Sequence, residues 1–306
     1  LGLLALTFFI GRVMPLDPML SIVGPDADRS TYEQVYRQLG LDRPLWVQFG
    51  YYLNDLMHGN LGRALLTGHD VVDDLRRVLP ATIELATLAI LIGTLAGVPL
   101  GVYAATQRGR FGDHAVRLFS LLGYSTPVFW FGMMGLLVFY AWLGWAGGVG
   151  RVGIAFEGQV APITGLLLVD SVLRGEWEVF RSALRHILLP GCILGLHSMA
   201  YLSRMTRAFM LAQLSQEYVT TARVKGLSER QVVWGHAFRN IRVQLLTIVA
   251  LAYGGLLEGA VLVETVFGWP GFGSYLTGSL LLGDMNAVMG SVLVVGVLFV
   301  ALNLGA

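Results

Sequence analysis

Long runs of uncharged, mostly apolar residues dominate the hydropathy pattern of this chain. Five runs contain at most one charged residue each: residues 78–107, 118–150, 186–203, 243–263 and 285–306. A helix needs about 20 apolar residues to cross the hydrocarbon core of a bilayer, so each run is close to or above the required length. Residues 1–14 form a shorter apolar run, which is expected to be a first transmembrane helix truncated at its start. The pattern predicts an all-α membrane protein with about six transmembrane helices.

The positive residues in the connections predict the side of the membrane that each connection occupies. The link after the second predicted helix contains Arg108, Arg110 and Arg117, and the link after the fourth contains six arginines and the only lysine, Lys225. Loops rich in Lys and Arg remain in the cytoplasm, so both links are predicted to be cytoplasmic. Residues 15–78 are amphipathic and carry more acidic than basic residues. This segment is predicted to lie on the extracytoplasmic surface.

Composition supports the membrane interpretation and excludes several other classes. The chain is 55% hydrophobic and 13% charged, whereas soluble domains have about 25% charged residues. Its basic residues are scattered and its net charge is +1, which gives no basic stripe for nucleic acid. A single cysteine, Cys192, excludes a disulfide within the chain and a cysteine-based metal site.

Glycine and proline within the predicted helices mark expected irregularities. Gly97, Pro99 and Gly101 lie in the second predicted helix and Pro127 lies in the third. Proline interrupts the backbone hydrogen bonds of a helix, and glycine lets two helix backbones approach closely. Kinks and tight helix contacts are expected at these positions.

The cytoplasmic link 217–240 carries the most specific local pattern. Residues 217–225 are compatible with a short helix, after which Gly226 can adopt the left-handed conformation that ends helices. Ser228 and Gln231 have the spacing of a capping box, which starts a second helix. The link is therefore predicted to fold as helix, glycine turn, helix.

The second helix of this link is predicted to present an apolar face to a soluble partner. That face consists of Val232, Val233, His236 and Ala237, with Arg230 and Arg239 left near water. An amphipathic helix of this kind can insert into a groove of another protein.

Several motifs together resemble a known family. Glu217, Ala222, Gly226, Leu227 and Ser228 match the cytoplasmic loop of the permeases of ATP-binding-cassette (ABC) importers. The other matching motifs are MPLDP at 14–18, LGLDRPLWVQF at 39–49, PATIELA at 80–86, GVPLGVYAA at 97–105, ALRHILLP at 183–190 and FGWPGFG at 267–273. Along nearly its whole length the chain resembles the dipeptide/oligopeptide/nickel type. Leu16 and Gln244 depart from the family pattern, which usually has Gly and Pro there, and Gln244 predicts a less kinked start of the fifth helix.

This resemblance implies a fold and a role for the cytoplasmic loop. It implies a type I ABC-importer permease fold for residues 79–306, preceded by the first helix at 1–14 and the outer segment at 15–78. The loop at about 217–240 would dock on an ATPase subunit. The residues carried over to this coupling role are Glu217, Tyr218, Ala222, Lys225, Gly226, Leu227, Ser228, His236, Arg239 and Asn240.

The resemblance also implies the partners of the chain. The sequence contains no G-x-x-x-x-G-K-[ST] phosphate loop, so ATP and Mg are expected on partner subunits, and this chain is expected to be non-catalytic, without cofactor or metal. Two ATP-binding subunits, a homologous second permease forming a heterodimer, and an extracytoplasmic solute-binding protein are expected. The location would be a bacterial inner membrane, crossed several times.

The solute and its path are less constrained by the sequence. Glu258 and His197 are ionisable residues within predicted helices, and such residues often line a path. A peptide or peptide-like solute is expected; nickel or a metal chelate, glutathione, an opine or an oligosaccharide are the alternatives within the family. An ion-coupled secondary transporter would leave the helix, glycine turn, helix pattern unexplained. A membrane-embedded enzyme would need a motif such as H-E-x-x-H or G-x-S-x-G, and neither is present.

Overall fold

The computed structural model describes residues 2–13, 28–38 and 40–305, and these residues form helices and one isolated β-bridge. The helices are α1 (Gly2–Val13), α3 (Arg29–Gln38), α4 (Leu45–Met57), α5 (Val71–Thr106), α6 (Phe111–Ser125), α7 (Val128–Gly135), η1 (Leu136–Trp142), η2 (Ile154–Phe156), α8 (Leu167–Arg174), α9 (Trp177–Leu214), α10 (Glu217–Val224), η3 (Gln231–Ala237), α11 (Phe238–Gly259), α12 (Val261–Val266), α13 (Phe272–Leu281) and α14 (Met285–Gly305). The MPLDP motif and the predicted boundary near residue 14 lie outside the described residues.

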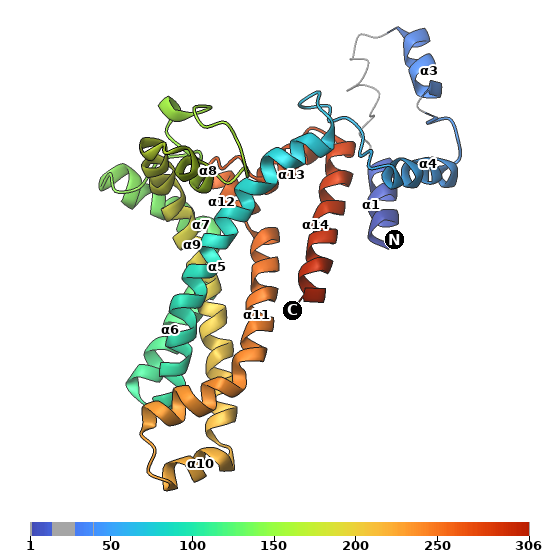
Figure 1. Cartoon of the computed structure of the whole chain (residues 1–306). Helices are drawn as coiled ribbons and strands as arrows, with labels where there is room; N and C mark the ends of the chain where they lie inside the picture. The colour runs from blue at the N-terminus through green and yellow to red at the C-terminus, as the bar shows by residue number, and fades with distance from the viewer. Residues whose placement is uncertain (1, 14–27, 39, 306) are drawn as a thin grey trace. The chain divides into compact units, whose positions relative to one another are not determined.

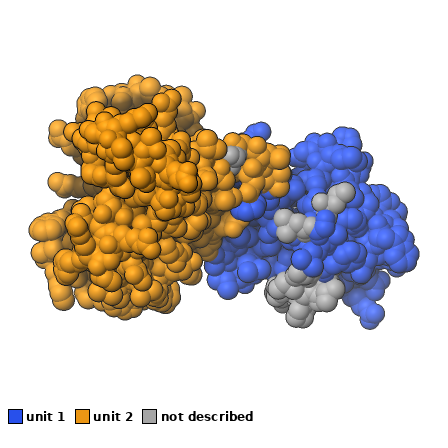
Figure 2. Space-filling model, turned by 90° about the horizontal axis from the view of Figure 1, so that it is seen from below, with its two compact units in different colours: residues 1–79, 271–299 blue, residues 80–270, 300–306 orange. Residues whose placement is uncertain are grey.

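The chain divides into two compact units, coloured separately in Figure 2. The first comprises residues 1–79 and 271–299, and the second comprises residues 80–270 and 300–306. In the first unit, apolar side chains from the start of α5, from α13 and from α14 form a small core that includes Val71, Phe272 and Ala287. The fully buried Asp284 accepts hydrogen bonds from the backbone N–H groups of Leu65 (2.6 Å) and Leu66 (3.2 Å). These bonds fix the loop before α5 onto the start of α14.

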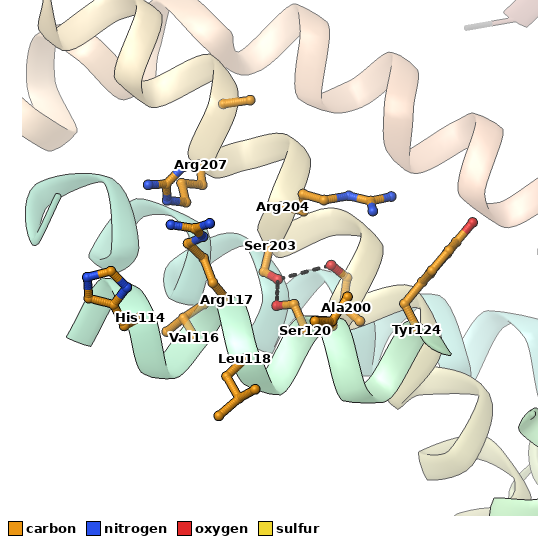
Figure 3. Close-up of a pocket in the computed structure, with 12 residues that line it drawn as sticks. His114, Val116, Arg117, Leu118, Ser120, Tyr124, Ala200, Ser203, Arg204 and Arg207 are labelled. Carbon is orange, nitrogen blue, oxygen red and sulfur yellow. Dashed lines mark hydrogen bonds between the residues drawn. The ribbon is translucent and has the colours of Figure 1, made fainter. Parts of the chain in front are cut away.

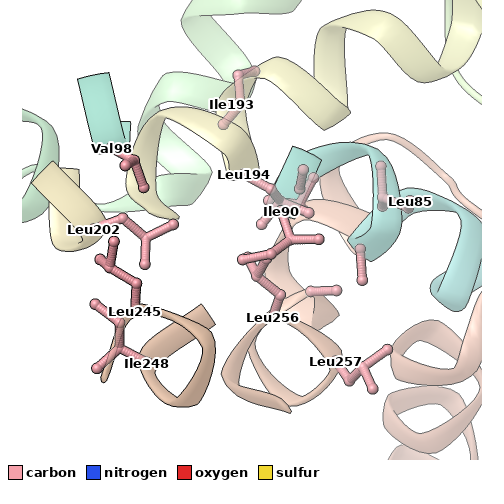
Figure 4. Packing of buried hydrophobic residues seen from close by; sticks show 14 of the residues in the cluster. Leu85, Ile90, Val98, Ile193, Leu194, Leu202, Leu245, Ile248, Leu256 and Leu257 are labelled. Carbon is pink, nitrogen blue, oxygen red and sulfur yellow. The ribbon is translucent and has the colours of Figure 1, made fainter. Parts of the chain in front are cut away.

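The second unit is built on three helices, α5, α9 and α11, which run beside one another in Figure 1. Figure 4 shows their shared core, with Leu85 and Ile90 from α5, Leu202 from α9 and Leu245 and Leu256 from α11. In a bilayer, lipid tails are as apolar as leucine, so helices associate mainly through close packing. This core therefore stabilises the unit through shape complementarity.

Glycines allow a close helix contact in that core, as the sequence predicts. A Cβ added at Gly97 would lie 2.8 Å from the carbonyl oxygen of Met199, and one at Gly101 would lie 2.5 Å from that of Ser203. Those distances leave no room for a side chain. The two glycines thus let α5 and α9 pack with their backbones in near contact.

Within the described part of the chain, four helices are long and apolar enough to cross a membrane: α5, α9, α14 and the continuous helix Gln231–Gly259. α6 and the α7–η1 helix count as a fifth span if taken together, and they meet at an angle of 93°. Pro127 lies at the bend and Thr126 is extended (ψ 133°), as is usual before proline. The kink expected at Pro127 is confirmed. α1, with 12 residues, is shorter than a span.

Two spanning helices are longer than the runs that predict them, α5 slightly and α9 by about twofold. α5 has 36 residues and α9 has 38, so each is more than about 50 Å long at 1.5 Å per residue. A hydrocarbon core is about 30 Å thick. Both helices therefore extend beyond the bilayer, and α9 leads directly to the cytoplasmic link.

Buried charges stabilise the end of the second unit that lies away from the link 217–240. Glu84 of α5 pairs with Arg151 through Nε (3.1 Å) and Nη2 (2.6 Å) and also accepts the N–H of Leu168 (2.7 Å). The same guanidinium donates to the carbonyl oxygen of Gly165. This clasp ties α5 to the loop before α8. Glu264 is likewise buried and accepts a hydrogen bond from Thr82 at 2.5 Å.

Asp170 organises the loop that precedes α8. Its carboxylate accepts backbone N–H bonds from Ile163, Thr164 and Gly165 and the hydroxyl of Thr164 (2.6 Å). Burial alone would raise the pKa of Asp170, but these four bonds to the ionised form outweigh burial, and the pKa lies below its ordinary value. The loop therefore depends on ionised Asp170.

We expect the stability contributed by Asp170 to depend on pH. Because its folded-state pKa is lowered, the contribution is fully present above the unfolded pKa of about 3.9 and is lost as pH falls through the folded pKa. Asp170→Asn should therefore lower the melting temperature of the purified chain at pH 7, and the difference from the wild type should shrink toward pH 3. A difference that stays constant across this range would contradict this role.

Candidate functional site

The turn between α10 and η3 is a helix-ending motif centred on Gly226. The Gly226 N–H donates to the carbonyl of Arg223 (2.9 Å), and the Leu227 N–H donates to that of Ala222 (3.3 Å). These two bonds define the Schellman motif, which needs a residue in the left-handed conformation directly after the end of the helix. Gly226 has φ +82°, so the glycine turn predicted from the sequence is confirmed.

Side chains on both sides of Gly226 fix the second helix of the turn. The Ser228 N–H donates to Oε1 of Gln231 (3.0 Å), and the Gln231 N–H approaches the Ser228 hydroxyl at 3.4 Å. This is the predicted capping box. Arg223 and Glu229 form a two-bond ion pair, at 2.8 and 3.2 Å, that bridges the glycine. The turn is therefore a locally determined rigid element at the end of the second unit, next to α10 in Figure 1.

The three apolar side chains of the face predicted to enter a partner are instead buried within the chain, whereas its fourth member, His236, is exposed. Val232, Val233 and Ala237 are at most 6% exposed, and Val232 packs against Val219 and Ala222 of α10. The prediction was wrong because η3 continues into α11 and lies against α9. Its apolar side chains are therefore covered within this unit.

The residues carried over to the coupling role divide into two groups in the structure. Tyr218, Ala222 and Leu227 are buried or half-buried and support the turn; the Tyr218 hydroxyl donates to Gln213 at 2.8 Å. The others are exposed: Glu217, Lys225, Gly226, Ser228, His236, Arg239 and Asn240. The surface open to another protein is thus mostly polar, with Val224 (83% exposed) and Trp234 (42% exposed) as apolar exceptions. Whether these residues couple to an ATPase stays a prediction.

A pocket of about 350 Å³, here the histidine pocket, lies between α6, α9 and α11. Its lining includes Tyr124 from α6, His197 and Tyr201 from α9, and Gly255 and Gly259 from α11. The His197 ring stacks on the Tyr124 ring, with centroids 5.1 Å apart. Among the described residues, Nδ1 of His197 is buried without a hydrogen-bond partner. The pocket therefore offers aromatic surfaces and uncharged polar groups.

The two path candidates predicted from the sequence are placed differently. His197 lines the histidine pocket, whereas Glu258 is exposed on α11 and lies between lining residues without lining the pocket itself. Sequence reasoning missed Tyr201 and Tyr124. Tyr201 follows His197 by four residues and so shares its helix face, which could have identified it. No local signal points to Tyr124, because it comes from another helix.

A second pocket of about 480 Å³, here the arginine pocket, lies between α6 and α9 (Figure 3). Arg117, Arg204 and Arg207 line it together with His114 and Tyr124. Hydrogen-bonded Ser120 and Ser203 hydroxyls (2.8 Å) join the two helices at its wall. Because Tyr124 also lines the histidine pocket, the two pockets share one wall residue.

Two family models together match most of the chain. One, described as binding-protein-dependent transport system inner membrane component, matches residues 97–306. The other, described as the N-terminal part of such a membrane component, matches residues 1–86.

Several curated proteins are similar to this chain over almost its full length. The probable D,D-dipeptide transport system permease protein of Escherichia coli strain K12 is 41% identical over 303 residues, covering 99% of this chain and 89% of that protein. The di/tripeptide transport system permease protein of Pseudomonas aeruginosa strain UCBPP-PA14 is 40% identical over 303 residues (99% and 90%). The dipeptide transport system permease protein of E. coli K12 is 37% identical over 306 residues (99% and 90%).

Proposed function

Because this chain belongs to the family of binding-protein-dependent transport system inner membrane components, we propose that it forms half of the path by which an ABC importer carries a peptide or peptide-like solute. The names of three relatives between 37% and 41% identical, all of them dipeptide or di/tripeptide permeases, support this solute class. The chain is a non-catalytic, multi-pass protein of a bacterial inner membrane. Its importer includes an ATPase and a solute-binding protein.

We further propose the composition of the complex. A second, different permease would complete the path, and two ATPase subunits would bind ATP and Mg. The exposed surface around Gly226 would receive the movement of one ATPase. The observation that carries this proposal is the Schellman turn, because a rigid, solvent-exposed element at the end of α9 and α11 can transmit displacement to both helices.

The histidine pocket is proposed as part of the path. Its volume of about 350 Å³ lies within the range of ligand pockets, about 300–1,000 Å³. Uncharged donors and acceptors beside aromatic surfaces suit a solute whose peptide backbone is constant while its side chains vary. Glu258, exposed beside Gly259, is proposed to face the path where the second permease completes it.

We expect His197→Leu to lower the kcat/KM of peptide uptake by about tenfold, the equivalent of one lost hydrogen bond of about 1.4 kcal/mol. Leucine keeps an apolar body but removes both ring nitrogens. Basal ATP hydrolysis should be unchanged, because the loop around Gly226 is untouched. The matched control is Cys192→Ala, an exposed position on the same helix that lines neither pocket. Equal uptake by the His197 variant and the control would show that His197 does not contribute to the path.

The solute class is tested by stimulation of ATP hydrolysis in the reconstituted complex. The solute-binding protein would be loaded in turn with a dipeptide, an oligopeptide, a nickel chelate, glutathione and an oligosaccharide. We expect dipeptide or oligopeptide to give the largest stimulation. If only a chelate or a sugar stimulates hydrolysis, the peptide proposal is wrong while the importer class stands.

A further inference from the structure

The arginine pocket carries positive charge that its surroundings do not neutralise. Asp113 pairs with Arg207 through two bonds, Nε to Oδ1 (2.6 Å) and Nη2 to Oδ2 (2.8 Å). Among the described residues, no carboxylate lies within ion-pairing distance of Arg117 or Arg204. The pocket therefore presents two arginines whose charge is available to an anion.

An aromatic ring holds one of these arginines in place. The Cζ atom of Arg204 lies 4.9 Å from the centroid of the Tyr124 ring, and Figure 3 shows the side chain extended toward it. A cation–π contact of this kind places the guanidinium over the ring face of the tyrosine and leaves its charge unneutralised. The N–H donors lie around its edge and remain able to bind an acceptor. Arg204 is thus positioned by Tyr124 without being neutralised.

The two pockets follow one another along α9. His197 and Arg204 both contact the Tyr124 ring, at 5.1 and 4.9 Å from its centre. They are two helical turns apart, or about 10 Å at 1.5 Å per residue, and Arg204 is nearer the end of α9 that leads to the cytoplasmic loop. An extended dipeptide is about 7 Å long. A solute in the histidine pocket therefore needs to move by about one and a half times its own length to reach Arg204.

We propose that the arginine pocket is an exit-side station that binds the carboxylate of the transported solute, with Arg117 and Arg204 as the binding groups. This inference rests on the proposed function. Guanidinium groups bind carboxylates through two parallel N–H···O bonds, and a peptide that retains a free C-terminus supplies such a group. The third arginine, Arg207, is paired with Asp113, so we assign it a positioning role in the wall of the pocket and not a binding role. Solutes without an anionic group would bypass the station.

Anionic phospholipid is the rival occupant. Leu118 and Leu121 line the same pocket and are 58% and 62% exposed, so acyl chains could cover them while a phosphate met the arginines. The shared residue Tyr124 favours the solute, because it places the arginine pocket directly beside the histidine pocket. A test must separate these two sources of anionic oxygen.

Protection of arginine from chemical modification provides that test without depending on the solute-binding protein. The full complex, in vesicles of zwitterionic lipid and without nucleotide, would be treated with phenylglyoxal, and modification of each arginine would be followed by mass spectrometry. The probes are a dipeptide at millimolar concentration, the same dipeptide with an amidated C-terminus, and vesicles that contain anionic phospholipid. Arg181, exposed on α9 at the opposite end from the cytoplasmic loop, is the internal control.

We expect the free dipeptide, at about nine times its dissociation constant, to slow modification of Arg117 and Arg204 by about tenfold, because about a tenth of the sites are then unoccupied. The amidated dipeptide should give little protection, and Arg181 should react equally throughout. Protection by anionic phospholipid alone, equal protection by both dipeptides, or no protection would each overturn the inference. Dipeptide uptake by the same vesicles after addition of ATP and the solute-binding protein separates the failures: intact uptake without protection rejects only this station, whereas absent uptake rejects the proposed function.

Discussion

Replacing Gly226 by valine is expected to abolish the stimulation of ATP hydrolysis by the solute-loaded binding protein while the complex still assembles. Gly226 has φ +82°, a conformation that costs L-residues about 1–2 kcal/mol and β-branched residues more. No atom lies within 4 Å of the position of an added Cβ, so the change acts only on the backbone. The strain would distort the turn and shift α10 relative to η3, although the packing of Val232 against α10 remains. The measurement is ATP hydrolysis by the reconstituted complex with and without loaded binding protein.

A second glycine provides the matched control. Gly158 also has a positive φ (+74°) and open space around it, but it lies between η2 and α8, in the connection far along the chain from the coupling loop. Gly158→Val therefore introduces similar strain elsewhere and should leave the stimulation close to the wild type. Equal loss in both variants would assign the effect to general destabilisation, and full stimulation in the Gly226 variant would exclude the turn from coupling.

Removing the charge of Glu84 is expected to cost about 3 kcal/mol or more of stability, the range for breaking one partner of a buried ion pair. Glu84→Gln leaves Arg151, whose side chain is 16% exposed, without its counter-charge. It also weakens the bond that the Leu168 N–H donates to this side chain. The melting temperature of the detergent-solubilised complex should fall by several degrees.

The double variant Glu84→Gln with Arg151→Met provides the control for this second effect. Removing both charges takes away the unpaired cation, so much of the lost stability should return. If the double variant is as unstable as the sum of the two single changes, the Glu84–Arg151 pair is not coupled and the clasp contributes nothing beyond its separate side chains.

Local sequence signals predicted those features whose determinants lie close together in the chain. Uncharged runs located α5, α9, α11 and α14, because each span must satisfy its own backbone hydrogen bonds in lipid. The turn at Gly226 followed from a glycine, a serine and a glutamine within a few residues. The bend at Pro127 was expected for the same reason, although its angle of 93° depends on how the two helices pack.

Features that join distant segments had no such signal. Tyr124 meets His197 and Arg204 only because α6 packs on α9, and nothing near residue 124 indicates this. The apolar face of η3 was assigned to a partner because its pattern shows that the face is buried but not what covers it. In the structure the covering residues belong to α9 and α10.

Peptide uptake by proteoliposomes that contain this chain, its partner permease and the ATPase subunits tests the importer mechanism most directly. Uptake would be measured with the loaded binding protein, with and without ATP at the ATPase face, in the absence of any ion gradient. We expect uptake only with ATP and the binding protein together, and its loss in the Gly226→Val variant. Uptake that proceeds without ATP when a proton or sodium gradient is imposed would contradict the ABC importer mechanism and indicate an ion-coupled transporter.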